Sequence, residues 1–242
     1  MKKIFFMLLI PMLFVSCSKS LTVEEVNVGD IVMTDGSVLT VEEFPNYKGK
    51  EKPVAVIFRI IEGVNGRIIG VGLDQKEEPV PFAYEDTKAF TINFKSTSGG
   101  VINQRYDPST DSYKNDGFLG SKSGKENWQK VKKVIKSSGL KNSEFPAYEF
   151  ALDYKKSRDL GKYKDEWYLP SIENLWYIYE NKDIINNAFR VCGVDELYDV
   201  LFWSSSQFFV AYDSVFAMYM DDGEVIPNLK DHDAYVLAVH DF

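Results

Sequence analysis

The amino-acid sequence predicts an α+β fold, with antiparallel strands at both ends of the chain and about three helices between them. Apolar and polar residues alternate in the first third of the chain and again near its end, which is typical of strands. Between these regions apolar residues recur every three or four positions, as they do on one face of a helix. The 242 residues, 45% of them hydrophobic, are enough for one sizeable domain with its own core.

Residues 1–17 are typical of a bacterial export signal. A basic start is followed by an apolar run over residues 4–15 and then by Ser16 and Cys17, a layout too short for a permanent membrane span. The stretch "LFVSC" is similar to a lipobox, with Phe14 where the commonest pattern has leucine. This predicts that Cys17 is acylated and anchors the protein to a membrane. The alternative is an ordinary signal cleaved near Ser16, which leaves Cys17 as an incidental thiol.

The export signal predicts a protein outside the cytoplasm, lipid-anchored to the cell envelope at the outer membrane or the cell surface. The polar residues 18–25 are expected to form a tether, and residues 26–242 the domain. Lipidation of Cys17 leaves Cys192 without a disulfide partner, and the apolar neighbours of Cys192 predict a buried thiol. The fold is therefore expected to stand on its core alone.

The first third of the chain is predicted to be a β-meander. The Asp-Gly pair at 35–36, favoured in tight hairpin turns, interrupts the alternating stretch "VGDIVMTDGSVLTVEEF". A longer strand is expected over residues 52–61, and the Asn-Gly pair at 65–66 then turns the chain into "IIGVGLDQ". Residues 96–123, rich in Ser, Gly, Asn and Asp, are expected to form a long surface excursion with room for short strands.

Three helices are predicted in the middle of the chain. In the first, the apolar residues of "WQKVKKVI" share one face, lysines take the other, and Gly139 supplies the stop. The second begins at Pro146, and "PAYEFALDY" repeats apolar residues at helical spacing. In the third, Ser171 is placed to cap "IENLWYIYENK". A short fourth helix is expected over residues 184–189.

The chain is predicted to end in strands. "VLFWSSSQF" comes first, "SVFAMYM" and "EVIPNL" flank the Asp222-Gly223 turn, and "AYVLAVHDF" is last. His240 lies in this final strand, where alternation lets every second side chain face solvent. Because strands occupy both ends of the chain, the terminal strands are expected to pair with each other.

Charge and motif spacing argue against several classes of function. A formal net charge of −8 repels phosphate backbones, so nucleic acid is not an expected partner. "GVGLD" has no helix directly after it to aim amides at a phosphate. Asp231, His232 and Asp233 are adjacent, so a strand would point them to opposite faces and supply at most two metal ligands. The sequence predicts no bound metal and no cofactor.

The triple serine at 204–206 raises the question of nucleophilic catalysis. It lacks the glycines of a nucleophile elbow, and the chain offers only His232 and His240 as histidine bases. We therefore predict a protein that is not an enzyme, and a hydrolase that uses acidic residues and His232 is the alternative. Fourteen tyrosines and four tryptophans exceed what such a core requires, and aromatic surface suits binding to sugars or proteins.

Three segments in order carry a resemblance to a known family. They are "FPAYEFALDY", "EWYLPSIENLWYIYENKDIINNAF" and the stretch from "FWSSSQFF" to "YVLAVHDF". They resemble the Lcl C-terminal-like family, typed by the C-terminal domain of a bacterial collagen-like adhesin, with its W-x-L-P-[ST] helix start, "WSS" strand and closing Y-V-x-x-V strand. The residues that match, and that the resemblance makes markers of the fold, are Trp167, Leu169, Pro170, Ser171, Leu175, Trp203, Ser204, Ser205 and Ser206.

The resemblance implies a C-type-lectin-like fold, in the branch related to formylglycine-generating enzymes. In that fold the terminal strands pair, and a loop-rich region near the C-terminus presents the ligand-binding surface. Relatives include adhesins that bind sulfated polysaccharides. This chain lacks a collagen-like repeat, the cysteine pair of a formylglycine-generating site and the calcium signature of lectins, which "EVIPN" matches only superficially. The resemblance therefore implies binding without catalysis and without calcium.

The sequence thus predicts an adhesin-like envelope lipoprotein whose C-terminal loops bind an extracellular polysaccharide or protein. The binding loops are expected around residues 208–213 and 230–235. The candidate ligand-binding residues are Tyr212, Asp213, Asp231, His232 and Tyr235. The alternatives are a hydrolase on the same scaffold and a structural envelope lipoprotein without a small ligand.

Overall fold

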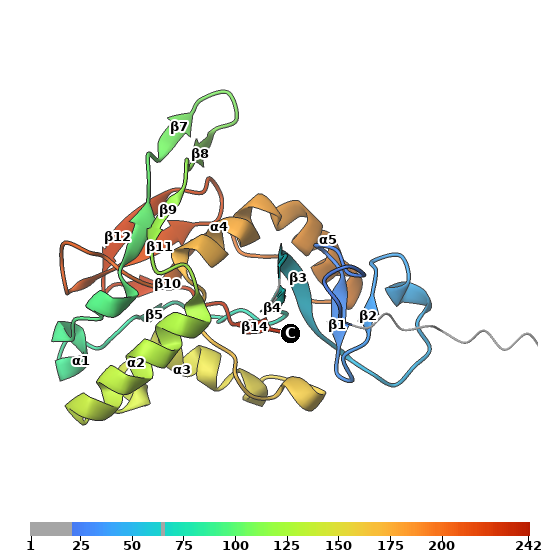
Figure 1. Ribbon diagram of the computed structural model, residues 1–242, viewed down its shortest axis with the longest axis horizontal. Helices are drawn as coiled ribbons and strands as arrows, with labels where there is room; N and C mark the ends of the chain where they lie inside the picture. The colour runs from blue at the N-terminus through green and yellow to red at the C-terminus, as the bar shows by residue number, and fades with distance from the viewer. Residues whose placement is uncertain (1–20, 64–65) are drawn as a thin grey trace, which may run out of the picture.

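The computed structural model describes residues 21–63 and 66–242 and has an α+β fold, as the sequence predicts. A five-stranded antiparallel sheet lies at one end of the molecule, in the order β14-β4-β3-β1-β2 (Figure 1). Its strands are β1 (Ile31–Met33), β2 (Val38–Leu39), β3 (Pro53–Ile61), β4 (Arg67–Gly72) and β14 (Val239–Asp241).

The first hairpin and the long strand are confirmed, but the predicted meander is wrong. β1 and β2 form the hairpin, and Gly36 in its turn has a φ of +91°, which favours glycine. β3 then pairs with β1 and not with β2, with Ile31 opposite Val56. Residues 40–52 carry the chain back across the hairpin, which leaves β2 at the sheet edge. Asn65, in the next predicted turn, lies outside the described residues.

The last strand joins the sheet of the first third of the chain. β14 pairs with β4, with His240 opposite Gly70, so the pairing partner is the fourth strand and not the first. Strands from the two ends of the chain therefore share one sheet, although the first and last strands are not neighbours. Val239 also exchanges backbone hydrogen bonds of 3.0 Å with Tyr168. These bonds join the segment just before the third predicted helix to this sheet.

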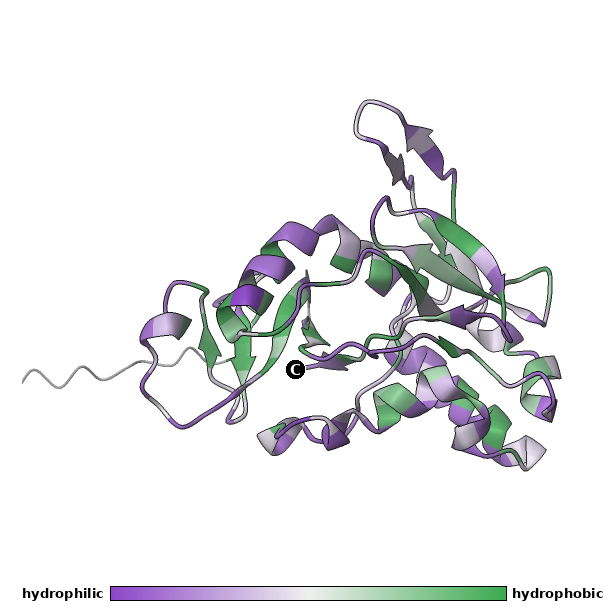
Figure 2. Ribbon diagram, turned by 180° about the vertical axis from the view of Figure 1, so that it is seen from behind, coloured by the Kyte–Doolittle hydropathy of each residue, from purple (hydrophilic) through white to green (hydrophobic). Residues whose placement is uncertain are grey.

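A second sheet and three ribbons make up the other end of the molecule (Figure 1). The sheet runs β10-β11-β12, formed by Leu201–Gln207, Ser214–Tyr219 and Val225–Leu229. The ribbons pair β5 (Val80–Pro81) with β13 (Asp233–Ala234), β6 (Gly99–Val101) with β9 (Phe118–Gly120), and β7 (Arg105–Asp107) with β8 (Ser112–Lys114). The β7–β8 ribbon, part of the predicted surface excursion, projects from the body and is mostly hydrophilic (Figure 2).

The predicted helices are confirmed, with small changes of length. They are α2 (Gly124–Ser138), α3 (Pro146–Leu152), α4 (Ile172–Glu180) and α5 (Lys182–Cys192), preceded by a one-turn α1 (Lys88–Thr91). Gly139 ends α2 in the left-handed conformation at φ +70°. Tyr154, the last residue of the second predicted stripe, lies in a 3₁₀ turn beyond α3 and is still buried.

The helices enclose the sheets in one continuous hydrophobic core. α2 and α3 lie along one side of the molecule and α4 and α5 along the other (Figure 1). Ser171 begins α4 as predicted: its hydroxyl accepts from the Asn174 N–H at 3.1 Å, and the Asn174 side chain accepts from the Ser171 N–H in return. The stability of the folded state depends on this core, because no disulfide is formed among the described residues.

The predictions for the export signal, the tether and Cys192 have different outcomes. The lipidation site Cys17 and the signal lie outside the described residues. Leu21 and Val23, within the predicted tether, pack against the core, because their apolar side chains gain by leaving water. Cys192 is half-buried rather than fully buried, since α5 runs along the surface. Among residues 21–63 and 66–242, no helix combines the length and apolarity needed to cross a membrane.

Candidate functional site: an aromatic groove and a loop face

The triple serine of β10 lies inside the core. Trp203 is fully buried and its indole N–H donates to the Val80 carbonyl at 2.8 Å. The Ser204 hydroxyl donates to the Phe216 carbonyl at 2.6 Å, across the sheet from β10 to β11. The Ser206 hydroxyl accepts from the Ile172 N–H at 3.1 Å, at the first turn of α4. These hydroxyls satisfy backbone groups between tightly packed elements and face no solvent.

Other residues that the sequence predicts to be fold markers lie close to the triple serine. The Pro170 carbonyl accepts from the Ser205 N–H at 2.7 Å, which fastens the start of α4 to β10. The Ser171 hydroxyl donates to the Lys122 carbonyl at 2.8 Å. The indole N–H of Trp167 donates to the Tyr163 carbonyl at 2.6 Å. All of these side chains hold elements together, and none lines one of the hollows described below.

Neither histidine contacts a serine hydroxyl in the described part of the chain. His232 is exposed and its Nδ1 lies 3.0 Å from the Asn228 side-chain oxygen. His240 is buried, contrary to the expectation from strand alternation, because Trp167 and Phe242 pack against its ring. Burial lowers the pKa of His240, and its Nε2 lies 3.0 Å from the Asp165 carbonyl oxygen. Among the described residues, neither histidine is therefore placed to act as a base toward the triple serine.

No group of three or more His, Cys, Asp or Glu side chains gathers closely enough to hold a metal ion within the described ranges. Asp231, His232 and Asp233 do not converge: Asp233 pairs with Pro81 in the β5–β13 ribbon, whereas His232 turns toward Asn228.

The two predicted binding loops meet at one point. The Lys230 N–H donates to the Asp213 carbonyl at 2.9 Å, so residues 208–213 and the turn after β12 are adjacent. Phe209, Val210 and Tyr212 are 60%, 73% and 53% exposed, and they form an apolar loop tip. Tyr235 lies elsewhere: its ring packs against Tyr198 at 5.6 Å, near the opposite end of β10. The structure therefore brings four of the five candidate residues to one face and separates Tyr235 from them.

Lys230, inside the second predicted loop, is fully buried. Its ammonium donates to the Ile92 carbonyl at 2.6 Å and lies 5.3 Å from the centre of the Phe94 ring. Burial lowers the pKa of Lys230 to about 7, and the nearby Asp213 charge opposes this effect only in part. Lys230 thus ties the segment after α1 to β12 and is not available to a ligand at the surface.

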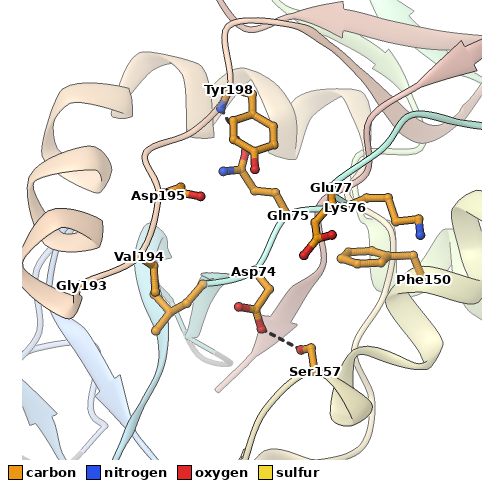
Figure 3. A pocket seen from close by; sticks show the side chains of 11 residues that line it. Asp74, Gln75, Lys76, Glu77, Phe150, Ser157, Gly193, Val194, Asp195 and Tyr198 are labelled. Carbon is orange, nitrogen blue, oxygen red and sulfur yellow. Dashed lines mark hydrogen bonds between the residues drawn. The ribbon is translucent and has the colours of Figure 1, made fainter.

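A solvent-open hollow of about 560 Å³ lies at the end of β4, between α3 and the chain after α5 (Figure 3). Phe150 and Ser157 come from one side of it and Val194 and Asp195 from the other (Figure 3). The residues that line it are Leu73, Asp74, Gln75, Lys76, Glu77, Phe150, Ser157, Gly193, Val194, Asp195 and Tyr198. Carboxylates, an amide and two aromatic rings thus border one hollow.

Hydrogen bonds hold the floor of this hollow in place. The Gln75 side chain bridges two backbone groups: it donates to the Glu196 carbonyl at 2.8 Å and accepts from the Tyr198 N–H at 3.0 Å. Asp74 accepts from the Ser157 hydroxyl at 2.7 Å and forms an ion pair with Arg158. These bonds lower the pKa of Asp74 although burial opposes them, so the carboxylate stays charged.

A second hollow of about 460 Å³ adjoins the first, and the two share Lys76, Phe150 and Ser157. It adds the exposed ring of Tyr84 and the carboxylates of Glu149 and Asp153. We call the two hollows together the aromatic groove. Tyr235 borders it indirectly through its contact with Tyr198.

The sequence did not single out this groove. The helical spacing of apolar residues in "PAYEFALDY" places Phe150 on the apolar face of its helix, yet it is only half-buried. The polar run at 74–78 directly after an apolar strand, and the polar residues after Gly193, were signals of a surface site. What the sequence could not show is that two segments about 120 positions apart lie beside each other, as the Gln75–Glu196 hydrogen bond records with its separation of 121.

The fold of this chain has a counterpart among solved structures. The crystal structure of a fimbrial protein from Bacteroides ovatus ATCC 8483 matches 89% of this chain with a TM-score of 0.61 and 13% sequence identity. This chain spans about half of that protein, because the match covers 48% of its length. No protein-family model matches the chain, and no curated protein matches it. At 13% identity the likeness shows the shared fold alone.

Proposed function

We propose that this protein is a surface-exposed, adhesin-like envelope protein that binds an extracellular glycan in the aromatic groove without catalysing a reaction. The observation that carries this proposal is the composition of the groove: Phe150, Tyr198 and Tyr84 lie beside carboxylates and the amide of Gln75 in two adjoining open hollows. Sugars present both C–H faces that pack on aromatic rings and hydroxyls that donate to carboxylate oxygens.

The geometry favours binding over turnover. Among the described residues no histidine lines either hollow of the groove, and Asp74 is already paired with Arg158. A general acid for hydrolysis needs a raised pKa, whereas the pKa of Asp74 is lowered. The fixed positions of Gln75 and Asp74 suit a preformed binding surface.

The remaining sequence expectations fit the same proposal. We take the fold to be C-type-lectin-like and related to the Lcl C-terminal-like family, because strands from both chain ends share one sheet and a loop-rich second sheet follows the helices. Export and lipid anchoring at Cys17 remain part of the proposal, supported by the leader sequence. The similar fold of a fimbrial protein suits a location at the cell surface.

The test is a glycan array probed with residues 18–242 and with the variant Tyr198→Ala. The variant is expected to lose about tenfold or more in affinity for any glycan that the wild type binds, because a stacking ring and its apolar area are removed. Tyr113→Ala, at a tyrosine that is half-buried like Tyr198 but lies on the projecting β7–β8 ribbon, is the matched control and should bind as the wild type does. Equal binding by all three proteins would place the glycan outside the groove.

A second candidate function rests on the loop tip. Phe209, Val210 and Tyr212 expose three apolar side chains in sequence proximity, beside Asp213, and such a patch suits a protein ligand. Asp231 and His232, on the adjacent turn, would then contribute the polar rim. A host-matrix protein array separates the two functions: Tyr212→Ala should weaken capture of a protein, while Tyr198→Ala should leave that capture unchanged.

A further inference from the structure

A further hollow, separate from the two that form the aromatic groove, lies at the opposite end of β4 and is lined mainly by polar residues. It has a volume of about 550 Å³ and sits between the ends of β3 and β4 and the start of α2. Its lining residues are Arg59, Ile61, Arg67, Ser96, Ser98, Gly120, Ser121, Lys122, Ser123, Glu126, Lys130 and Glu173. We call it the basic hollow. The length of β4 separates it from Asp74 in the aromatic groove by roughly 20 Å, at about 3.3 Å per residue.

Four cations reach the basic hollow from separate elements: Arg59 from β3, Arg67 from β4, Lys122 from the segment before α2, and Lys130 from α2. Two carboxylates, Glu126 and Glu173, line it with them, and Asp241 pairs with Arg67 just beyond the lining, so four cations face three carboxylates. The chain as a whole carries −8, so this concentration of positive charge is a local exception.

The two arginines are held in fixed positions. Arg59 donates to Glu173 at 3.0 Å, and its guanidinium lies 4.1 Å from the centre of the Tyr177 ring. Arg67 donates to Asp241 through two nitrogens, at 3.0 and 2.8 Å. Each guanidinium carries five N–H donors, so both keep donors free after these bonds. Fixed donors of this kind lose little entropy when an anion binds.

Two lysines and two serines add further hydrogen-bond donors to the basic hollow. Lys130 has no ion-pair partner among the described residues, and Lys122 lies 4.0 Å from Glu173 at the limit of an ion pair. The hydroxyls of Ser96 and Ser98 make no hydrogen bond within the described part of the chain, although both line the hollow. Ammonium, guanidinium and hydroxyl donors around one space are the chemistry that recognises a tetrahedral oxyanion.

We propose that the basic hollow binds the phosphate group of a phosphomonoester, independently of the ligand of the aromatic groove, and glucose 6-phosphate serves as the probe. A phosphomonoester carries close to two negative charges at neutral pH and offers three strong acceptor oxygens, which suits a site where cations are in excess and several donors are free. A carboxylate, with one charge and a planar pair of oxygens, would leave most of these donors unused.

The experiment titrates residues 18–242 with glucose 6-phosphate and with glucose by isothermal calorimetry. The phosphorylated sugar is expected to bind, the unphosphorylated sugar is not, and the affinity should fall as NaCl is raised, because exposed charges are screened. The double variant Lys122→Gln/Lys130→Gln should bind the phosphosugar about fivefold or more weakly, since two of the four cations are removed.

The matched control is Lys48→Gln/Lys136→Gln, which removes two exposed lysines outside the hollow and should bind as the wild type does. Circular dichroism establishes that each variant is folded, which is expected because Lys130 is half-buried and the other three lysines are exposed. Equal binding of glucose and its phosphate, absence of phosphosugar binding, or an equal effect of the two double variants would each overturn the proposal. Tyr198→Ala should leave this binding unchanged, so failure here is distinct from failure of the glycan proposal.

Discussion

The side-chain amide of Asn127 in α2 donates a hydrogen bond of 3.0 Å to the hydroxyl of Ser205 in β10. Both residues are buried, and the same amide lies 3.3 Å from the Ser205 carbonyl. This contact joins a helix to a strand 78 positions later in the chain. It explains why a serine stands at a place that an apolar residue would fill in an ordinary core: the amide needs an acceptor.

Ser205→Ala is expected to lower the free energy of unfolding by about 1–2 kcal/mol, because a buried amide donor loses its better acceptor. Urea unfolding followed by tryptophan fluorescence measures this change. Ser138→Ala, at the exposed end of α2, is the control and should change stability by less than about 0.5 kcal/mol. If glycan binding by folded Ser205→Ala fell while stability stayed constant, the structural role of the triple serine would be wrong.

Ser171→Ala should destabilise the protein more than Ser123→Ala, although both serines are helix N-caps. The Ser171 hydroxyl caps α4 and also donates to the Lys122 carbonyl, and it is fully buried, whereas the Ser123 hydroxyl only caps α2 at a more open position. We expect a loss of about 2 kcal/mol at Ser171 and about 1 kcal/mol at Ser123, measured by urea unfolding. Equal losses would show that the Lys122 contact contributes nothing.

Lys230 should make the stability of the protein depend on pH above neutrality. Burial lowers its pKa to about 7 in the folded state, whereas the unfolded chain keeps the ordinary value near 10.5. Between these values the unfolded state binds more protons, so the free energy of unfolding should rise with pH, by up to about 1.4 kcal/mol per pH unit. Below pH 7 both states are charged, and this contribution to stability is lost.

Urea unfolding at pH 6.5 to 9 compares the wild type with Lys230→Met, which keeps the length of the side chain and removes its charge. The free energy of unfolding of the wild type should rise with pH relative to that of Lys230→Met, because the wild type sheds the buried charge. Lys136→Met is the control and should follow the wild type at each pH. A constant difference across this range would contradict a lowered pKa for Lys230.

Cys192 should react slowly with thiol reagents while the protein is folded. Burial raises the pKa of its thiol to about 12, and the nearby Arg158 opposes this effect only in part, so little thiolate exists at neutral pH. Alkylation of residues 18–242 by iodoacetamide at pH 7.5, followed by mass spectrometry, should be more than about tenfold slower than in urea. The protein without residues 1–17 has Cys192 as its single cysteine, which makes the signal unambiguous. Equal rates in buffer and urea would show a free, ordinary thiol.

Local features of this protein follow from the sequence, because they depend on the conformation of a few consecutive residues. Gly36 in the first hairpin, Gly139 at the end of α2 and Ser171 at the start of α4 lie where the sequence predicts them. Each signal is a backbone preference or a short-range hydrogen bond, and neither needs the rest of the fold. The α+β class follows in the same way from the periods of the apolar residues.

The tertiary structure decides which distant segments are in contact, and the spacing of apolar residues does not determine this. The pairing of β3 with β1, the burial of His240 and Lys230, and the separation of Tyr235 from Tyr212 all depend on contacts between distant segments. The candidate groove likewise forms only where the chain after β4 meets the chain after α5, and the basic hollow only where β3, β4 and α2 converge. A sequence pattern records which face of an element is apolar, but the free energy that selects its neighbour comes from packing the whole core at once.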